Sequence, residues 1–329
     1  MTTTAEIFNA FNKLNILIVG DVMIDRYLSG SVTRISPEAP VPVVHLKESQ
    51  DRLGGAANVA LNIKALGATP YLCSCIGADE NGTLFEQLLP AHQLQEKGLI
   101  RSKDRITTVK TRVLSNHQHL LRVDREDTHD LSSEDEMAYL AKIREILNTK
   151  TIHLILFQDY NKGVLTYKVI QKIILEAIKR DIPTVVDPKF KHFWAYKKVS
   201  LFKPNLREIQ QQLPFEVKPT IDSLKKASEE IKSKLGNKHT LITLSEKGLF
   251  YDSEGEIAIL PTQARQIADV CGAGDTVISI VALGMALSLG MHQIANLANL
   301  AGGQVCEKVG VVPVDKAQLL QEYEDLLGN

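Results

Sequence analysis

Short apolar runs alternate with longer amphipathic segments along most of this chain. The apolar runs are residues 15–19, 152–157, 184–186 and 241–244, and the segments with helical periodicity are residues 55–66, 133–147, 165–180 and 220–235. A strand that is apolar on both faces is typical of a buried parallel sheet, and parallel strands need long, usually helical connections. The alternation therefore predicts an α/β fold in which helices cover a mostly parallel central sheet.

Two stretches interrupt this alternation. Residues 27–46 and 107–125 contain β-branched residues, alternating polarity and turn formers, and they lack a helical period. The second stretch predicts a hairpin around Ser115 and Asn116. We expect both stretches to form a small sheet that stands off the main body; the alternative is that they extend the main sheet. No internal repeat or low-complexity linker divides the chain, so we expect one domain over residues 1–329.

Charge and hydropathy argue against two classes of partner. The formal net charge is -1 at pH 7, which gives no general attraction to nucleic acid or to an anionic membrane. The N-terminus lacks the basic start of a signal peptide, and the most apolar stretch, residues 277–291, is too short to span a bilayer. We therefore expect a cytoplasmic protein. Zinc-site spacing is absent from the cysteines, which we expect to be reduced: Cys73, Cys75, Cys271 and Cys306.

The strongest local signal is a glycine turn before an apolar helix. Residues 269–276 read DVCGAGDT, and the expected helix follows over residues 277–289. Gly272 and Gly274 allow a sharp turn and a close approach of the backbone to a ligand. A helix N-terminus placed behind such a turn binds anions, including the charge on a transferring phosphoryl group. Asp275 would then act either as a simple helix cap or as a general base, and this segment alone leaves both interpretations open.

Polar residues follow two other expected joints between a strand and a helix. Gly54 and Gly55 precede a helix that carries Asn58 in its first turn. Asp21 and Asp25 follow the first strand, at the sheet edge where open α/β folds bind ligands.

Two further polar groups lie later in the chain. Asn205 and Glu208 lie three residues apart on one face of a starting helix. Residues 243–248 (TLSEKG) follow a buried strand and offer hydroxyl and backbone N–H groups to phosphates. No Gly-x4-Gly-Lys-Ser/Thr sequence occurs, which excludes a P-loop.

Together, and in this order, these motifs resemble those of the ribokinase/PfkB carbohydrate kinases over essentially the whole chain. The resemblance implies a three-layer sandwich with a small β-sheet lid, and an ATP-dependent sugar kinase. Residues 20–44 (GDVMIDRYLSGSVTRISPEAPVPVV), 157–163 and 186–189 are similar to the kinase half of bifunctional heptose kinase/adenylyltransferases. That branch implies phosphorylation of D-glycero-D-manno-heptose 7-phosphate at O1, for ADP-heptose and lipopolysaccharide. The alternatives are a kinase of another sugar or sugar phosphate, and a non-catalytic sensor of sugar or nucleotide.

The resemblance also implies roles for particular residues. Asp275 would be the base, with an anion hole at Gly272, Ala273 and Gly274. The residues that would contact the sugar substrate are Asp25, Gly54, Gly55, Asn58, Asp159 and Lys189. The residues that would bind ATP are Asn205, Glu208, Thr243, Ser245, Gly248, Asn299 and Gly303, with Glu208 also serving Mg²⁺.

Three expectations concern charge, cations and partners. A substrate phosphate needs local cations in a chain with no net positive charge, and Lys110 and Arg112 alternate on one face of a lid strand. Some family members bind a monovalent cation between the glycine turn of residues 269–276 and a later loop near Gly310. In this chain, Cys271 replaces the threonine that is usual in the glycine turn. The open edges and apolar face of a small lid favour a homodimer through the lid. Because the chain ends at Asn329, we expect a separate protein to supply adenylyl transfer.

Overall fold

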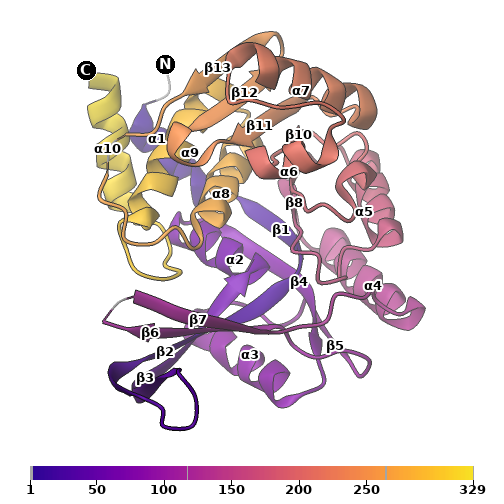
Figure 1. Ribbon diagram of the computed structural model, residues 1–329. Coiled ribbons are helices and arrows are strands. Elements are labelled where there is room, and N and C mark those ends of the chain that lie inside the picture. The colour runs from indigo at the N-terminus through magenta and orange to yellow at the C-terminus, as the bar shows by residue number, and fades with distance from the viewer. Residues whose placement is uncertain (1–2, 117, 264, 329) are drawn as a thin grey trace.

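The computed structural model describes residues 3–116, 118–263 and 265–328, and its centre is a nine-stranded sheet (Figure 1). The strand order is β13-β12-β11-β10-β9-β8-β1-β4-β5, and all neighbours are parallel except β11–β12 and β12–β13. The strands are β1 (Asn15–Gly20), β4 (Thr69–Gly77), β5 (Leu99–Ser102), β8 (Leu154–Gln158), β9 (Thr184–Asp187), β10 (Leu201–Phe202), β11 (His239–Thr243), β12 (Leu249–Ser253) and β13 (Glu256–Leu260).

Helices cover both faces of this sheet and complete a three-layer sandwich. One face carries α1 (Thr4–Phe11), α2 (Ala56–Ala65), α3 (Glu80–Ala91), α8 (Ala273–Ala286), α9 (Met291–Cys306) and α10 (Lys316–Gly328). The other carries α4 (Ser133–Thr149), α5 (Tyr167–Lys179), α6 (Leu206–Gln212), α7 (Ile221–Leu235) and a short 3₁₀ turn, η1 (Phe193–Ala195). Along β1, Ile16 and Ile18 face the first layer whereas Leu17 and Val19 face the second. The predicted α/β sandwich is confirmed.

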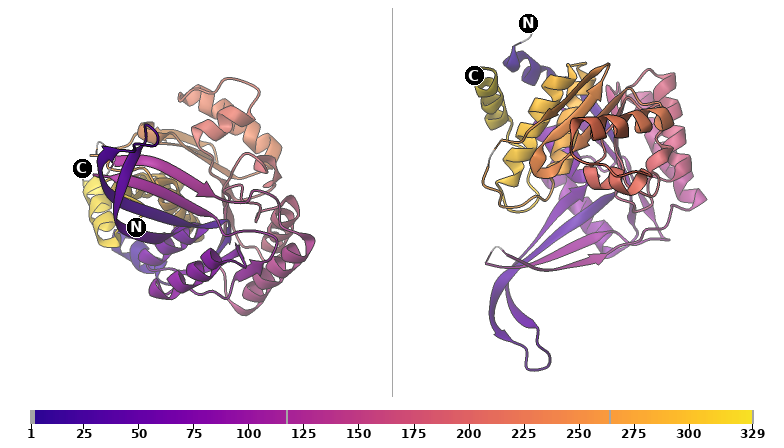
Figure 2. Two further views of the ribbon diagram at one scale, coloured as in Figure 1. Left: turned by 60° about the horizontal axis from the view of Figure 1, so that its bottom comes forward. Right: turned by 45° about the horizontal axis from the view of Figure 1, so that its top comes forward.

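A second sheet of four strands, which we call the lid sheet, stands off the main body. Its order is β3-β2-β6-β7, built from β2 (Val22–Ile35), β3 (Pro42–Gly55), β6 (Val109–Ser115) and β7 (Gln118–Arg125). Figure 2 shows the β2–β3 hairpin reaching beyond β6 and β7 as a long arm. These strands therefore do not extend the main sheet. The expected hairpin turn contains Asn116 and position 117, which lies outside the described residues.

The lid strands extend further toward the main sheet than the predicted stretch of residues 27–46. Asp25 and the glycine pair lie outside that stretch, but they belong to β2 and β3, where Asp25 pairs with Arg52 and Met23 pairs with Gly54. A β-carbon at Gly54 would lie 2.1 Å from Asp25 Oδ2, so a larger residue there would force this carboxylate to move. Glycine at position 54 thus leaves room for the Asp25 carboxylate beside the main sheet.

The cysteines are reduced, as the sequence predicts. Cys73 and Cys75 are buried in β4, whereas Cys271 and Cys306 are only partly buried, and all four are free thiols. Burial raises the pKa of the Cys75 thiol to about 11. Among the described residues, the helices are all too short or too polar to cross a membrane.

Candidate active site

The site begins where three neighbouring parallel strands end together. Gly20 of β1 is in register with Gln158 of β8, and Gln158 is in register with Asp187 of β9. The carboxyl ends of parallel strands form the edge at which ligands bind in α/β sheets. Gln158 Nε2 donates to Asp187 Oδ2 at 3.3 Å across this edge. The N-terminus of α8 and the inner ends of the lid strands lie against the same edge.

The N-terminus of α8 has free backbone donors. Gly272 is its N-cap residue, with φ of 83°, and no side chain caps the helix there. The first intrahelical bond that leaves this turn runs from Thr276 N to Gly272 O at 3.0 Å, so the N–H groups of Gly274 and Asp275 have no partner within the helix. A β-carbon at Gly274 would meet no protein atom within 4 Å. Open space beside free N–H groups at a helix N-terminus suits an anion such as phosphate.

Asp275 lies in the first turn of α8, yet its carboxylate does not cap the helix. It is 4% exposed and accepts hydrogen bonds from three side chains. Asn58 Nδ2 donates to Oδ2 at 2.8 Å, whereas Gln158 Nε2 at 3.1 Å and the Tyr160 hydroxyl at 2.6 Å donate to Oδ1. A carboxylate held by three donors from α2 and from the end of β8 fits a reactive group better than a cap.

The environment of Asp275 gives its carboxyl the acidity expected of a general base. The pKa of Asp275 is raised to about 6, mainly because the group is buried; the hydrogen bonds from Tyr160 and Asn58 lower it, and the carboxylates of Asp187 and Asp25 raise it. A pKa just below neutrality leaves the carboxylate ionised at pH 7 and able to accept a proton.

Tyr160 and Gln158 belong to the site but were not assigned a role from the sequence. Both lie in the stretch of residues 157–163 that resembles the heptose kinases. The signal that would have found Gln158 is its position as the last residue of β8, at the ligand-binding edge of the sheet. Two ammonium groups lie near the ring of Tyr160, with Lys110 Nζ at 5.5 Å and Lys189 Nζ at 5.7 Å from its centroid.

Two buried carboxylates brace the loop that carries Tyr160. Asp21 accepts from the backbone N–H groups of Tyr160 at 2.7 Å, Lys162 at 3.1 Å and Val164 at 3.1 Å. Asp159, predicted to contact substrate, uses one oxygen for Asn161 N at 2.8 Å and the other for the Tyr196 hydroxyl at 2.8 Å. Burial raises the pKa of Asp159 to about 7. The Asp159 carboxylate therefore stabilises the conformation of this loop.

The lid sheet places its charges opposite the Asp275 carboxylate. Arg112 forms a buried ion pair with Asp25, so its guanidinium already has a carboxylate partner. Lys110 lies two residues before Arg112, on the same face of β6. It forms no ion pair with any carboxylate in the described part of the chain. Burial and the nearby Lys162 lower the pKa of Lys110. Arg122 pairs with Arg112 in register, but its side chain is exposed and contacts Asp124 at 3.0 Å.

Asn205 and Glu208 form a capping box at the start of α6. Glu208 N donates to Asn205 Oδ1 at 2.8 Å, and Asn205 N donates to Glu208 Oε2 at 2.8 Å. The other oxygen of Glu208 forms an ion pair with Lys189. Burial alone would lower the pKa of Lys189, but Asp187 and Glu208 raise it. No group of three or more metal-ligating side chains occurs in residues 3–116, 118–263 and 265–328.

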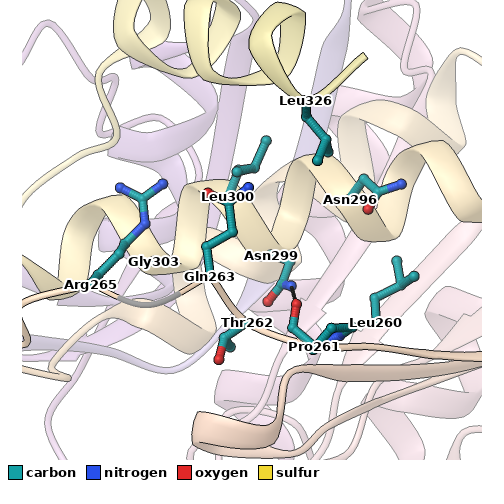
Figure 3. Close-up of a pocket in the computed structure, with 10 residues that line it drawn as sticks. All are labelled: Leu260, Pro261, Thr262, Gln263, Arg265, Asn296, Asn299, Leu300, Gly303 and Leu326. Atoms are coloured by element: carbon teal, nitrogen blue, oxygen red, sulfur yellow. Dashed lines mark hydrogen bonds between the residues drawn. The ribbon is translucent and has the colours of Figure 1, made fainter. Parts of the chain in front are cut away.

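Two of the residues predicted to bind ATP line a cavity of about 240 Å³ (Figure 3). Asn299 and Gly303 of α9 form one wall, and Asn299 Nδ2 donates to Pro261 O at 2.7 Å. Arg265 closes one end, held by Glu322 at 2.5 Å and Glu307 at 3.1 Å. A β-carbon at Gly303 would lie 2.7 Å from Arg265 Nε, so glycine leaves room for this side chain.

The other predicted nucleotide residues lie between this cavity and Glu208. Thr243 forms a parallel bridge with Asn205, next to the capping box. The 3₁₀ turn η2 (Ser245–Lys247) follows, closed by Gly248 N donating to Ser245 O at 3.1 Å. Thr262 in the cavity wall donates to Glu246 O at 2.7 Å. Thr243, Ser245 and Gly248 thus lie on one surface that continues from the cavity to α6.

Solved structures share this fold. Phosphofructokinase-2 from Escherichia coli, in complex with potassium, superposes with a TM-score of 0.80 at 17% identity, over 96% of this chain and 99% of that chain. Ribokinase from Arabidopsis thaliana, complexed with ribose and ATP, gives a TM-score of 0.70 at 18% identity over 94% and 98%. The fold is ribokinase-like.

The chain belongs to the pfkB family of carbohydrate kinases, whose model matches residues 13–317. It is therefore a phosphotransferase with an alcohol group as acceptor, as the sequence predicted. The bifunctional protein HldE of Methylobacillus flagellatus is 41% identical over 94% of this chain, and that of Campylobacter curvus is 38% identical over 96%. This chain spans 63% and 65% of the length of those two relatives.

We predict that Asp275 titrates near neutrality. Because burial penalises its charged form, we expect a midpoint near pH 6, against about 3.9 for an exposed aspartate. Carbon NMR of the protein labelled at its aspartate carboxyl groups measures the midpoint, and Asp275→Asn identifies the resonance. A midpoint near 4 would contradict the buried, carboxylate-flanked environment.

Proposed function

We propose that this protein transfers the γ-phosphoryl group of ATP to O1 of D-glycero-D-manno-heptose 7-phosphate, which yields the 1,7-bisphosphate for ADP-heptose and lipopolysaccharide. The observation that carries the proposal is the buried carboxylate of Asp275 beside free N–H groups at the start of α8. The similarity to HldE proteins over nearly the whole chain and the heptose-kinase-like residues 20–44 support the choice of sugar. Use of ATP and the absence of a spanning helix among the described residues fit a cytoplasmic location.

The proposed reaction is an in-line displacement. Asp275 removes the proton of the sugar hydroxyl, so that the O–H bond breaks as the oxygen attacks the γ-phosphorus. The bond to the bridging oxygen breaks in turn, and its electron pair leaves with ADP. The N–H groups of Gly274 and Asp275 stabilise the charge on the transferring group. Gly272 and Ala273 shape this anion hole.

The sugar lies between the lid sheet and α8 in this proposal. Asp25 and Asn58 contact its hydroxyls, and the glycine pair Gly54 and Gly55 leaves room for it beside the sheet edge. Lys189 joins them from the loop after β9. Asp159, the other residue predicted to contact the sugar, lies in the loop beside this surface, where each of its oxygens accepts one hydrogen bond from the protein.

ATP lies along the surface that joins the cavity at Asn299 and Gly303 to α6. Thr243, Ser245 and Gly248 contact the phosphates, and Asn205 and Glu208 lie at the reacting end. A donor set of one carboxylate suits Mg²⁺ that arrives bound to phosphates, because Mg²⁺ keeps several waters and needs few protein ligands. Glu208 would hold the ion, which would neutralise phosphate charge during transfer.

A monovalent cation is part of the proposal. Asp269 links the two loops concerned, since Cys271 N donates to its Oδ1 at 3.0 Å and Gly310 N to its Oδ2 at 3.0 Å. Backbone carbonyls of these loops would supply the ligands, which Cys271 does not prevent. The potassium complex of phosphofructokinase-2, a protein of the same fold, supports the expectation.

We predict phosphorylation that depends on the sugar. ADP release should require D-glycero-D-manno-heptose 7-phosphate, exceed that with hexose phosphates or free sugars, and be faster in potassium than in tetramethylammonium chloride. Asp275→Asn keeps the size of the side chain but removes the base, so turnover should fall by roughly two to four decades. A coupled assay measures both. Turnover of the variant within a few-fold of the parent would contradict the base, and ATP consumption independent of any sugar would favour a sensor.

We predict that Lys110 of the lid sheet binds the phosphate group of the substrate. Lys110→Met should raise KM for the phosphorylated sugar by roughly one to two decades, because a charge-assisted hydrogen bond is lost. KM for ATP should change little. Arg112→Ala should raise KM for phosphorylated and unphosphorylated sugars, since it also leaves Asp25 without its partner.

Arg122→Ala is the matched control for this test. Arg122 is a lid arginine on the same strand face, but it is exposed and pairs with Asp124. It should leave both Michaelis constants unchanged. If Lys110→Met handled phosphorylated and unphosphorylated sugars with the parent's preference, the phosphate would be bound elsewhere.

We predict a homodimer in which two lid sheets pack together. Exposed apolar side chains gather on the lid: Ile35, Val41, Leu46, Leu120, Leu121 and Val123. Light scattering should give a dimer mass at micromolar concentration, and Leu121→Lys combined with Val123→Lys should give a monomer. Leu175→Lys, on the exposed face of α5, should leave the dimer intact. A monomer mass for the parent would contradict the proposal.

A further inference from the structure

The three donors to Asp275 leave an unequal number of free positions on its two oxygens. A carboxylate offers about four lone-pair positions, two on each oxygen. Gln158 and Tyr160 occupy both positions on Oδ1, whereas Asn58 occupies one on Oδ2. One acceptor position is therefore left, and it is on Oδ2. A sugar hydroxyl that approaches this carboxylate without displacing a donor must give its proton to Oδ2.

Besides Asp275, three charged residues contact Tyr160. Its backbone N–H donates to the buried Asp21 at 2.7 Å. Lys110 of the lid sheet and Lys189 of the main body both place an ammonium group within 6 Å of its ring centroid, so cations from both parts of the protein contact the ring. Burial and the neighbouring Asp275 raise the pKa of Tyr160 well above its ordinary value. The phenol therefore stays protonated and donates to Asp275 throughout the neutral range.

We propose that Tyr160 is the positioning residue of the catalytic carboxylate: its hydroxyl fixes Oδ1 of Asp275 and leaves Oδ2 to accept the proton of the sugar hydroxyl. The proposal rests on the proposed role of Asp275 as general base. Gln158 shares the same oxygen, but its amide also donates to Asp187, which divides its interaction between two carboxylates. Tyr160 makes the shorter bond, and its hydroxyl has Asp275 as its one hydrogen-bond acceptor among the described side chains.

This contact has a measurable consequence because a hydrogen bond to the charged form favours that form. The other charged groups around Asp275 are known and remain in place in a Tyr160 variant. Asp187 of β9 is paired with Lys203 at 3.1 Å, and Asp25 of β2 is paired with Arg112. Loss of the phenol hydroxyl alone should therefore make Asp275 a weaker acid, and the ionised base should be lost at a higher pH.

The test is the pH dependence of kcat/KM for D-glycero-D-manno-heptose 7-phosphate in the full-length protein. The parent should lose activity as the pH falls through about 6, because Asp275 becomes protonated. In Tyr160→Phe, this acid limb should move upward by about one to two pH units, the shift that corresponds to one charge-assisted hydrogen bond. KM for ATP should stay within a few-fold of the parent's.

Tyr139→Phe is the matched control. Tyr139 is a fully buried tyrosine of α4, whereas Tyr160 is partly buried, and its hydroxyl likewise makes one hydrogen bond, to Cys73 O at 2.9 Å, without contacting Asp275. This variant should lose stability without moving the acid limb. An unmoved limb in Tyr160→Phe would overturn the proposal, and an equal shift in Tyr139→Phe would overturn it by showing a general effect of lost packing.

Two further measurements separate the remaining outcomes. The residual activity of Asp275→Asn should lack the acid limb, and a limb that persists there would overturn the base assignment and the proposal with it. If Tyr160→Phe does not fold, 3-fluorotyrosine at position 160 keeps the ring and makes the phenol a stronger donor. The limb should then move downward, and a limb in the parent's position would overturn the proposal while leaving the base assignment intact.

Discussion

A carboxylate buried among protein atoms must be compensated by hydrogen-bond donors or lose its charge. Asp275 is such a group, and much of the site follows from how it is compensated. Its donors come from the lid–helix junction, through Asn58, and from the end of a central strand, through Gln158 and Tyr160. Because they belong to distant parts of the sequence, Asp275 ties the lid junction, the sheet edge and α8 together.

The lid sheet supplies the second half of the electrostatic arrangement. Asp25 would add another unpaired negative charge near Asp275, but Arg112 pairs with it. Lys110 is left beside the Tyr160 ring, with its pKa lowered by burial and by Lys162, at a place where an anionic substrate would enter. Although the formal net charge of the protein is -1, the positive charge of Lys110 thus lies beside the Tyr160 ring. Lys110 and Arg112, although alternate residues on one strand, therefore have different charge partners.

Several predicted residues have structural contacts that a motif does not reveal. Asn205 and Glu208 form a helix capping box, and Asp159 braces a loop through Tyr196. Gly54 is required by the approach of Asp25. These contacts do not exclude ligand binding by Asn205 or Glu208, because Mg²⁺ and phosphates need only part of an oxygen's capacity. They do explain why such residue types occur at these positions even before a ligand is considered.

The sequence by itself determined the fold class, the order of the motifs and the glycine turn that carries Asp275. Apolar periodicity and glycine positions are local properties, so strands β1, β8, β9 and β11, the helices between them and the turn before α8 could be predicted from them. Only the tertiary structure decided that Tyr160 and Gln158 donate to Asp275 and that Arg112 pairs with Asp25. These contacts join residues 87 to 117 positions apart. Burial and pairing over such separations depend on how the layers and the lid pack, which no local pattern encodes.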